Sequence, residues 1–258
     1  MKHLNVCIFI TILLFGELFG VIGCSEKKSD LIESTEQGNL LMVKELIRAG
    51  ADVNEKDNKG NTALMQAASN EYTDIARYLI KVGANVNEKN NNGYTALMSA
   101  SLLANIDILK DLIKAGADVN RKNNDGMRVL TLISTLNMPT DYIDVIKELI
   151  KAGADINEKQ YNGNTFLMRE ISNGRTDIVR YLIKAGADIN EKNNDGNTSL
   201  MMATSNGRAD IVRYLIQAEV NVNEKNNNGW TALIVAKNTG QRDIIQIIEE
   251  AVAKQATR

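Results

Sequence analysis

Between positions 163 and 190 the apolar residues form two short stripes with the spacing of an α-helix. The first stripe consists of Leu167, Met168 and Ile171, and the second consists of Ile178, Val179, Leu182 and Ile183. Asn173-Gly174 lies between the two stripes and interrupts the helical pattern. The pattern predicts two helices of about nine residues each, joined by a short turn.

The polar residues that flank these stripes are of the types that start and end helices. The hydroxyl of Thr165 is placed to cap the first helix, and Asp177 suits the positive end of the second helix dipole. Gly186 is suited to the left-handed conformation that ends a helix, and Asn194-Asp195-Gly196 predicts a hairpin-like turn. Helices this short are unstable alone in water, so we expect neighbouring pairs to bury each other's stripes.

The same pattern recurs along most of the chain. Turn glycines lie at positions 60, 93, 126, 163, 196 and 229, which gives spacings of 33, 33, 37, 33 and 33 residues. The phrase after the glycine recurs as NTALM at 61–65, YTALM at 94–98, NTFLM at 164–168, NTSLM at 197–201 and WTALI at 230–234. This sequence resembles the ankyrin-repeat family, whose unit has a T-P-L-H-type helix start and a G-A-D-V-N ending. The resemblance covers residues 29–258 and implies an all-α ankyrin-repeat solenoid of about seven helix-turn-helix units with hairpin-like turns.

Two positions of the helix start depart from the family pattern in every complete unit that retains the phrase. The proline is replaced by Ala63, Ala96, Phe166, Ser199 and Ala232, and the histidine by Met65, Met98, Met168, Met201 and Ile234. Methionine is an adaptable apolar side chain, so we expect this series to pack in the core and not to bind metal. Glu219 is a further departure, because it replaces a glycine that ends the helix in other units.

The unit at residues 127–159 is the most irregular. Its departures are Arg128 in place of the capping threonine, Ile133 in a slot that alanine fills in most units, and four extra residues near 136–142. The next unit places Glu170 in the same alanine slot. Drift in a tolerant loop and a local functional adaptation both explain these changes. In either case we expect residues 127–171 to be the least stable internal stretch.

Residues 1–23 have the features of a secretory signal peptide. Lys2 supplies positive charge, residues 6–15 form an apolar core, and Gly23 is a small residue at the end. The tetrapeptide Val21-Ile22-Gly23-Cys24 resembles a bacterial lipobox, which implies that Cys24 is acylated and becomes the new first residue. Residues 24–28 would then be the lipidated cysteine and a short tether. The expected location is the bacterial cell envelope, as a membrane-anchored lipoprotein facing the periplasm or the cell surface.

Two alternatives remain for this N-terminal segment. Residues 6–22 nearly reach the length that spans a membrane, which would make them an uncleaved anchor. Plain secretion without acylation is the other alternative. Glu17 lies inside the apolar stretch and weakens the interpretation of residues 1–23 as a regular signal peptide.

Composition excludes several kinds of chemistry from the repeat region. The chain contains one histidine, His3, and two cysteines, Cys7 and Cys24, so no thiol or imidazole follows Cys24. Thiolate catalysis, Ser-His catalysis and zinc sites built on those side chains are therefore excluded there. The formal net charge of -2 gives no basic footprint for nucleic acid, and no glycine-rich phosphate loop occurs. We expect no cofactor and no small-molecule substrate.

Positions that differ between units indicate where a partner would bind. The residue after the turn glycine is Asn61, Tyr94, Met127, Asn164, Asn197 or Trp230, and a first-helix position expected to face solvent is Gln66, Ser99, Leu132, Arg169, Met202 or Val235. The resemblance implies that a partner meets the concave face, formed by the turn tips and first helices. Because the fold does not fix these positions, we take Tyr94, Arg169, Trp230, Met127 and Met202 as candidate partner-binding residues. Ordinary surface variation is the alternative explanation.

The function that follows is a non-catalytic protein-protein interaction scaffold, an envelope lipoprotein that binds a protein of unknown identity. A surface-exposed protein that binds a host molecule is the alternative. An enzyme that uses carboxylate or lysine chemistry is a distant one, because no such residues are grouped by the sequence pattern.

Overall fold

The computed structural model describes residues 30–135 and 142–256, which form seven helix pairs. The first helices of the pairs are α2 (Asp30–Glu36), α4 (Ala63–Ser69), α6 (Ala96–Leu102), α8 (Val129–Thr135), α10 (Phe166–Ser172), α12 (Ser199–Ser205) and α14 (Ala232–Thr239). The second helices are α3 (Leu40–Arg48), α5 (Thr73–Lys81), α7 (Ile106–Lys114), α9 (Ile143–Lys151), α11 (Thr176–Lys184), α13 (Ala209–Gln217) and α15 (Arg242–Ala256). The signal segment 1–23, the tether 24–28 and residues 136–141 of the insertion lie outside the described residues.

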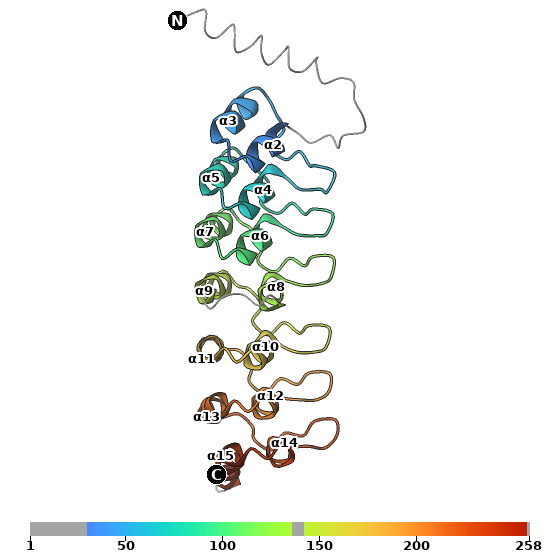
Figure 1. Ribbon diagram of the computed structural model, residues 1–258, viewed down its shortest axis with the longest axis vertical. Helices are drawn as coiled ribbons and strands as arrows, with labels where there is room; N and C mark the ends of the chain where they lie inside the picture. The colour runs from blue at the N-terminus through green and yellow to red at the C-terminus, as the bar shows by residue number, and fades with distance from the viewer. Residues whose placement is uncertain (1–29, 136–141, 257–258) are drawn as a thin grey trace, which may run out of the picture.

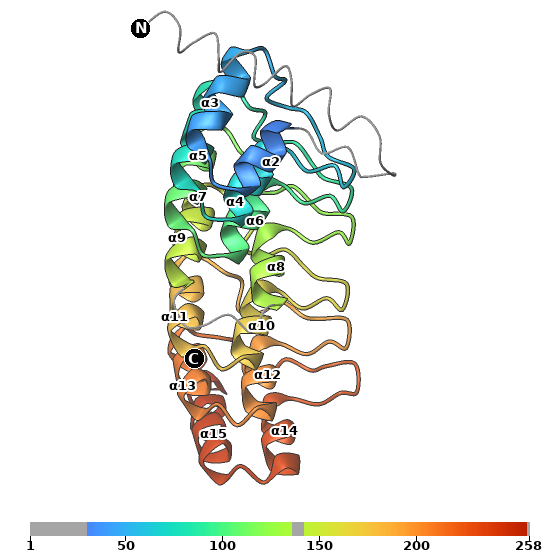
Figure 2. The same cartoon turned by 45° about the horizontal axis from the view of Figure 1, so that its top comes forward.

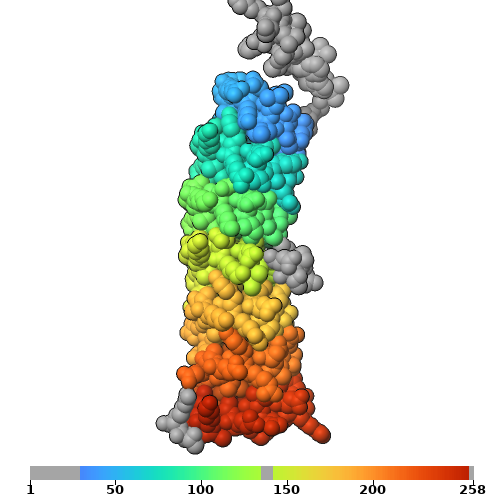
Figure 3. Space-filling view, turned by 90° about the vertical axis from the view of Figure 1, so that its left-hand side faces the viewer, coloured from blue at the N-terminus to red at the C-terminus, as the bar shows by residue number. Residues whose placement is uncertain are grey.

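The pairs stack into a solenoid with three parallel columns (Figure 1): the second helices, the first helices, and a row of hairpin-like loops that all project to the same side. First helices contact the first helices of neighbouring units, and second helices contact second helices at every junction except that between α9 and α11, where any contact is weaker. Figure 2 shows the same columns from another direction, and Figure 3 shows the units as successive layers of one continuous stack. The described residues contain no strand, only isolated bridges at Lys159–Thr165 and Lys192–Thr198. The predicted all-α repeat fold is confirmed.

Threonine caps start the first helices, as predicted from Thr165. The hydroxyl accepts a hydrogen bond from the backbone N–H three residues later, at 3.3–3.4 Å, in Thr62, Thr95, Thr165, Thr198 and Thr231. Each cap satisfies one of the N–H groups that a helix start leaves without an intrahelical partner. Helix α8 follows Arg128, which has no such hydroxyl and makes other contacts described below.

The two predicted apolar stripes form the core of each unit, with one exception. The buried members at 163–190 are Leu167, Met168, Ile171, Ile178, Val179 and Leu182, whereas Ile183 is only half-buried. The methionine series is confirmed as core, since Met65, Met98, Met168 and Met201 are at most 4% exposed. Ile234 in the same slot is 38% exposed, because no further unit in the described chain covers α14. The prediction of buried packing, which was made for the methionines, is therefore confirmed.

Glu219 adopts the left-handed conformation that the repeat pattern predicts for its position. Its φ is 61°, and the equivalent Gly186 has a φ of 93°. Glu71 and Ala104 also have positive φ, at 61° and 55°, in a loop where other units carry glycine. The sequence pattern did not single out these two residues, although the same comparison between units identifies them.

Replacing Glu219 with glycine is expected to stabilise the protein by about 1 kcal/mol, because a residue with a Cβ is disfavoured in the left-handed region. The midpoint of urea unfolding measures the change. Gly186→Ala is the matched control: a Cβ there would meet no atom within 4 Å, so only backbone strain should lower its midpoint. An unchanged or lower midpoint for Glu219→Gly would contradict the prediction.

Candidate protein-interaction surface

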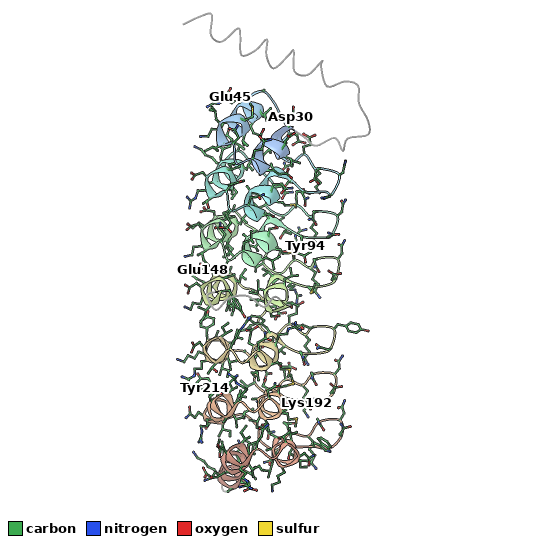
Figure 4. All side chains as sticks on the ribbon, in the orientation of Figure 1. Asp30, Glu45, Tyr94, Glu148, Lys192 and Tyr214 are labelled. Atoms are coloured by element: carbon green, nitrogen blue, oxygen red, sulfur yellow. The ribbon has the colours of Figure 1, made fainter. Side chains whose placement is uncertain are left out.

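The five candidate partner-binding residues lie on one side of the solenoid. Tyr94, Met127 and Trp230 follow the turn glycine, where each hairpin returns to its first helix, and Arg169 and Met202 lie on α10 and α12. Figure 4 labels Tyr94 between α6 and its hairpin. Since equivalent positions in stacked units face the same way, these residues share the side that we call the hairpin face.

Their accessibility differs. Trp230 is 43% exposed, whereas Tyr94, Met127 and Met202 are half-buried and pack against the core. Arg169 is half-buried as well, and its Nη1 donates a hydrogen bond to Oε1 of Gln160 at 3.3 Å. No hydrogen bond or ion pair in the described part of the chain joins two of the five. They are separate contact points along a face and do not form a compact cluster.

The first-helix position expected to face solvent does so only in some units. Gln66, Ser99, Arg169 and Met202 are half-buried there, but Leu132 is 3% exposed and Val235 is 9% exposed. The expectation is therefore wrong for Leu132 and Val235. Leu132 and Val235 are buried in the packing between helices, which removes these two residues from a candidate surface.

The hairpins are linked to each other by a repeating set of hydrogen bonds. The side-chain Nδ2 of Asn91, Asn124, Asn194 and Asn227 donates to a backbone carbonyl of the preceding hairpin at 2.8–2.9 Å. The backbone N–H of the same four residues donates to the preceding hairpin as well. Lysines add a second series: Lys56, Lys89, Lys159 and Lys192 donate from Nζ to a carbonyl of the following hairpin. The lysines and asparagines of these turns are thus ordered links between units.

These links are interrupted once between the described hairpins, where hairpin 121–128 meets hairpin 158–165. Tyr161 occupies the position that asparagine holds in the other five hairpins, so the side-chain amide donor is missing. In the described chain no hydrogen bond joins the backbone N–H of Tyr161 to Asp125, although the equivalent bonds exist at the other junctions. A Cβ at Gly126 would meet no atom within 4 Å, whereas at Gly93 it would collide with the backbone of Asn124. We call this junction, between Asp125 and Tyr161, the seam.

The seam is open only at the hairpin tips. Nearer the second helices, the backbone N–H of Asp155 donates to Oδ1 of Asn120 at 2.9 Å, as equivalent residues do in other units. The side chain of Tyr161 is fully exposed, at 103% of its reference area. Tyr161 is not among the predicted partner-binding residues, because the positions that predicted them follow each turn glycine, whereas Tyr161 precedes it. The residues before the glycine carry the signal, Gln160-Tyr161 in place of Asx-Asn.

One buried carboxylate lies beside the seam and is paired with basic residues. Glu158 is 8% exposed, and its Oε1 lies 2.7 Å from Nη1 of Arg128 and 3.7 Å from Nζ of Lys122. The hydroxyl of Thr131 donates to its Oε2 at 3.4 Å. Burial raises the pKa of Glu158, and the charges of Arg128 and Lys122 act in the opposite direction. Arg128, which replaces a capping threonine, therefore compensates a buried charge.

A second buried carboxylate, Glu170, lies in the alanine slot of α10. It is completely buried, and the hydroxyl of Tyr142 donates to its Oε2 at 2.7 Å. Nη1 of Arg175 lies 3.4 Å from the same oxygen, and the Arg175 guanidinium stacks 4.6 Å from the centre of the Tyr142 ring. Among the described residues, Oε1 of Glu170 finds no hydrogen-bond partner. Burial raises the pKa of Glu170 to about 8, against the positive charge of Arg169.

The best-defined hollows of the described surface do not involve these carboxylates. Two hollows of about 390 and 370 Å³ lie at the loops before α13 and α15 and before α3 and α5, away from Glu158 and Glu170. In the described ranges no three His, Cys, Asp or Glu side chains are grouped so that they could hold a metal ion. No helix between residues 30 and 256, as far as the structure describes them, is long and apolar enough to cross a membrane.

Comparison with known proteins agrees with this architecture. Residues 31–123, 136–226 and 185–256 match the family model "Ankyrin repeats (3 copies)". A stretch of 48 residues is 48% identical to protein phosphatase 1 regulatory subunit 27 of Homo sapiens and of Mus musculus. That stretch is 19% of this chain and spans 31% of those relatives, about a third of their length.

Two solved structures share the fold along their whole length. The ankyrin repeat domain of Bcl-3, described as a unique member of the IkappaB protein family, superposes with a TM-score of 0.78 at 24% identity, covering 87% of this chain and 100% of that one. The human ASB11 ankyrin repeat domain gives a TM-score of 0.69 at 22% identity, covering 85% and 98%. At this level of identity the likeness shows the fold alone.

Proposed function

Because this chain belongs to the ankyrin-repeat family, we propose that it is a non-catalytic scaffold that binds another protein through its hairpin face. Ankyrin repeats imply protein-protein interaction, and the family resemblance assigns it to the concave side formed by hairpins and first helices. The observation that supports this side is the variation of Tyr94, Met127, Arg169, Met202 and Trp230 within phrases that are otherwise nearly constant. A fold supports many partners, so the choice of partner depends on such positions.

Tyr161 extends the same proposal. Its ring is fully exposed on the hairpin that also positions Gln160, the hydrogen-bond partner of Arg169. Exposed tyrosine and arginine are enriched at protein interfaces, and tyrosine contributes a large contact area at low entropic cost. The match to a phosphatase regulatory subunit covers 31% of that protein, and it supports a protein partner without identifying one. Crosslinking in cells followed by affinity capture would supply the partner, and the variants discussed below then test the surface.

We further propose that the protein is an envelope lipoprotein attached through Cys24. The support is the lipobox-like tetrapeptide at 21–24, which follows an apolar segment. This feature lies outside the described residues, and the proposal therefore rests on the sequence.

Metabolic labelling with a clickable fatty acid is expected to label the wild-type chain and not the Cys24→Ala variant, because only Cys24 lies at the lipobox position. Cys7→Ala is the matched control and should be labelled like the wild type, since residues 1–23 would be removed before the lipidated chain matures. Equal labelling of wild type and Cys24→Ala would contradict acylation at this site.

A further inference from the structure

We propose that the first turn of α3 contacts the lipid surface of the membrane, with Leu41 and Met42 as the contacting side chains; this rests on the proposed attachment through Cys24. Leu41 is 71% exposed and Met42 is 39% exposed, and we call these two residues the apolar turn. They lie in the first unit of the stack, the unit that follows the proposed tether in the sequence.

Comparison with the other units shows that the fold does not require a leucine at position 41. The second residue of every other second helix is aspartate: Asp74, Asp107, Asp144, Asp177, Asp210 and Asp243. An acidic residue there interacts favourably with the positive end of the helix dipole, and α3 has no acidic residue in its first turn. At position 41 in water, both the dipole of α3 and the exposure of the side chain favour aspartate over leucine. Leu41 therefore needs another explanation.

The exposure of Met42 has a different cause, and its side chain adds to the apolar turn. The equivalent Ile75 and Ile108 are at most 2% exposed, because the second helix of the preceding unit covers them. No preceding unit covers Met42 in the described chain. Its apolar character follows from the repeat, and its exposure follows from its place at the end of the stack.

One exposed position of this end carries a polar residue: in α2, Asp30 takes the place that Ala63 holds in α4. Ser34 and Thr35, in the places of Ala67 and Ala68, are polar but buried, and the hydroxyl of Thr35 donates to the backbone carbonyl of Leu31 at 2.8 Å. Terminal units of solenoids require polar residues on their outer side, and Asp30 is such a residue. The first unit is thus more polar than its neighbour at α2. At position 41 of α3 it is less polar than any other unit.

The position of the tether indicates that a lipid surface contacts the apolar turn. Helix α2 begins at Asp30, so five residues separate it from Cys24, and a fully extended chain of that length reaches roughly 20 Å. α2 packs directly against α3. A lipid on Cys24 would hold this end of the solenoid at the membrane, where the apolar turn meets the boundary of headgroups and acyl chains.

The charges near the apolar turn indicate an apolar contact and not attraction to anionic lipid. Asp30 and Glu33 are exposed on α2, and Arg48 is paired with Glu45 at 2.9 Å one turn farther along α3. Lys44 lies over the ring of Tyr78, 5.6 Å from its centre. No described cation of α3 is thus aimed outward beside Leu41, and the contact depends on the two apolar side chains.

Photo-crosslinking to lipid tests the inference on the full chain in a bacterial host that processes lipoproteins. Membrane lipids are labelled with a diazirine fatty acid, irradiated, and the adducts are mapped by mass spectrometry. We expect adducts at Leu41 or Met42 and about tenfold fewer in Leu41→Asp, because leucine gains from leaving water and aspartate does not. Leu41→Asp carries the residue of the other six second helices, so its fold and melting midpoint should be preserved. Leu103, which is 43% exposed and lies two units away from α2, is the matched control and should carry no adducts.

The outcomes separate this inference from the proposed anchor. Acylated Cys24 without adducts at 41–42 overturns the lipid contact and leaves the lipoprotein proposal intact. Adducts at 41–42 in the absence of acylation support the lipid contact while the anchor proposal fails. A photoreactive leucine in the chain reports other occupants: a crosslink from position 41 to a second copy, or to residues 1–23, would overturn the inference.

Discussion

Glu170→Gln is expected to leave stability nearly unchanged at pH 5 and to raise it at pH 8. In the folded protein burial raises the pKa of Glu170 from 4.5 to about 8. The buried carboxyl is therefore protonated over a pH range in which the unfolded chain has already lost the proton. The folded state binds more protons there, so its stability is fully present below about pH 4.5 and is lost as pH rises toward 8. The wild type should lose on the order of 3 kcal/mol across this range.

Glutamine removes the titration and keeps the shape, and its amide oxygen can still accept the hydroxyl hydrogen bond of Tyr142. Urea unfolding at pH 5 and pH 8 measures the difference, with the exposed Glu55→Gln as the matched control. Hydrogen exchange of the wild type at a single pH locates the destabilised region. Backbone amides of α8 and α10 should exchange faster than those of α4 and α12. The same difference between variant and wild type at both pH values would rule out a buried titrating Glu170.

The helical repeat could be predicted because the same local sequence signals recur in each unit. The stripe at Leu167 and Met168, the cap at Thr165 and the left-handed residue at Glu219 all follow from local rules that recur with the period. A solenoid unit contacts only its neighbours, so a local pattern is enough to give the architecture.

The seam and its carboxylates were predictable only in part. The irregular residues Arg128, Ile133 and Glu170 were visible as departures, but their partners were not. Glu170 meets Tyr142 from the preceding unit, across 28 residues and beside an insertion, so no fixed spacing connects the two. Tyr161 could be identified from the sequence, because comparing the residues before each turn glycine shows a single tyrosine among asparagines.

Truncating Tyr94, Arg169 or Trp230 to alanine is expected to weaken binding of the partner by about 2 kcal/mol or more, roughly thirtyfold. Tyr94 and Trp230 occupy equivalent positions four units apart, about 40 Å at a packing distance of about 10 Å per step. Arg169 lies between them, on the unit whose hairpin carries Tyr161. These residues span the seam, so a partner that uses all of them would bridge the junction where, among the described hairpins, the tips are not joined by hydrogen bonds. Tyr161→Asn, which restores the residue of the other hairpins, should weaken binding while adding a link between units.

The controls must lie away from the hairpin face and match the variants in exposure and charge. Asn197→Ala is unsuitable, although it changes the position equivalent to Tyr94, because Oδ1 of Asn197 accepts a hydrogen bond from Asn226 of the next unit at 2.9 Å. Leu103→Ala matches Trp230, since both side chains are 43% exposed and Leu103 lies between α6 and α7. Arg213→Ala on α13 matches Arg169 in charge. Both controls should bind like the wild type in calorimetric titration. If the variants at 94, 161, 169 and 230 also do so with the fold intact, the partner binds elsewhere, and the insertion near 136–142 becomes the surface to test.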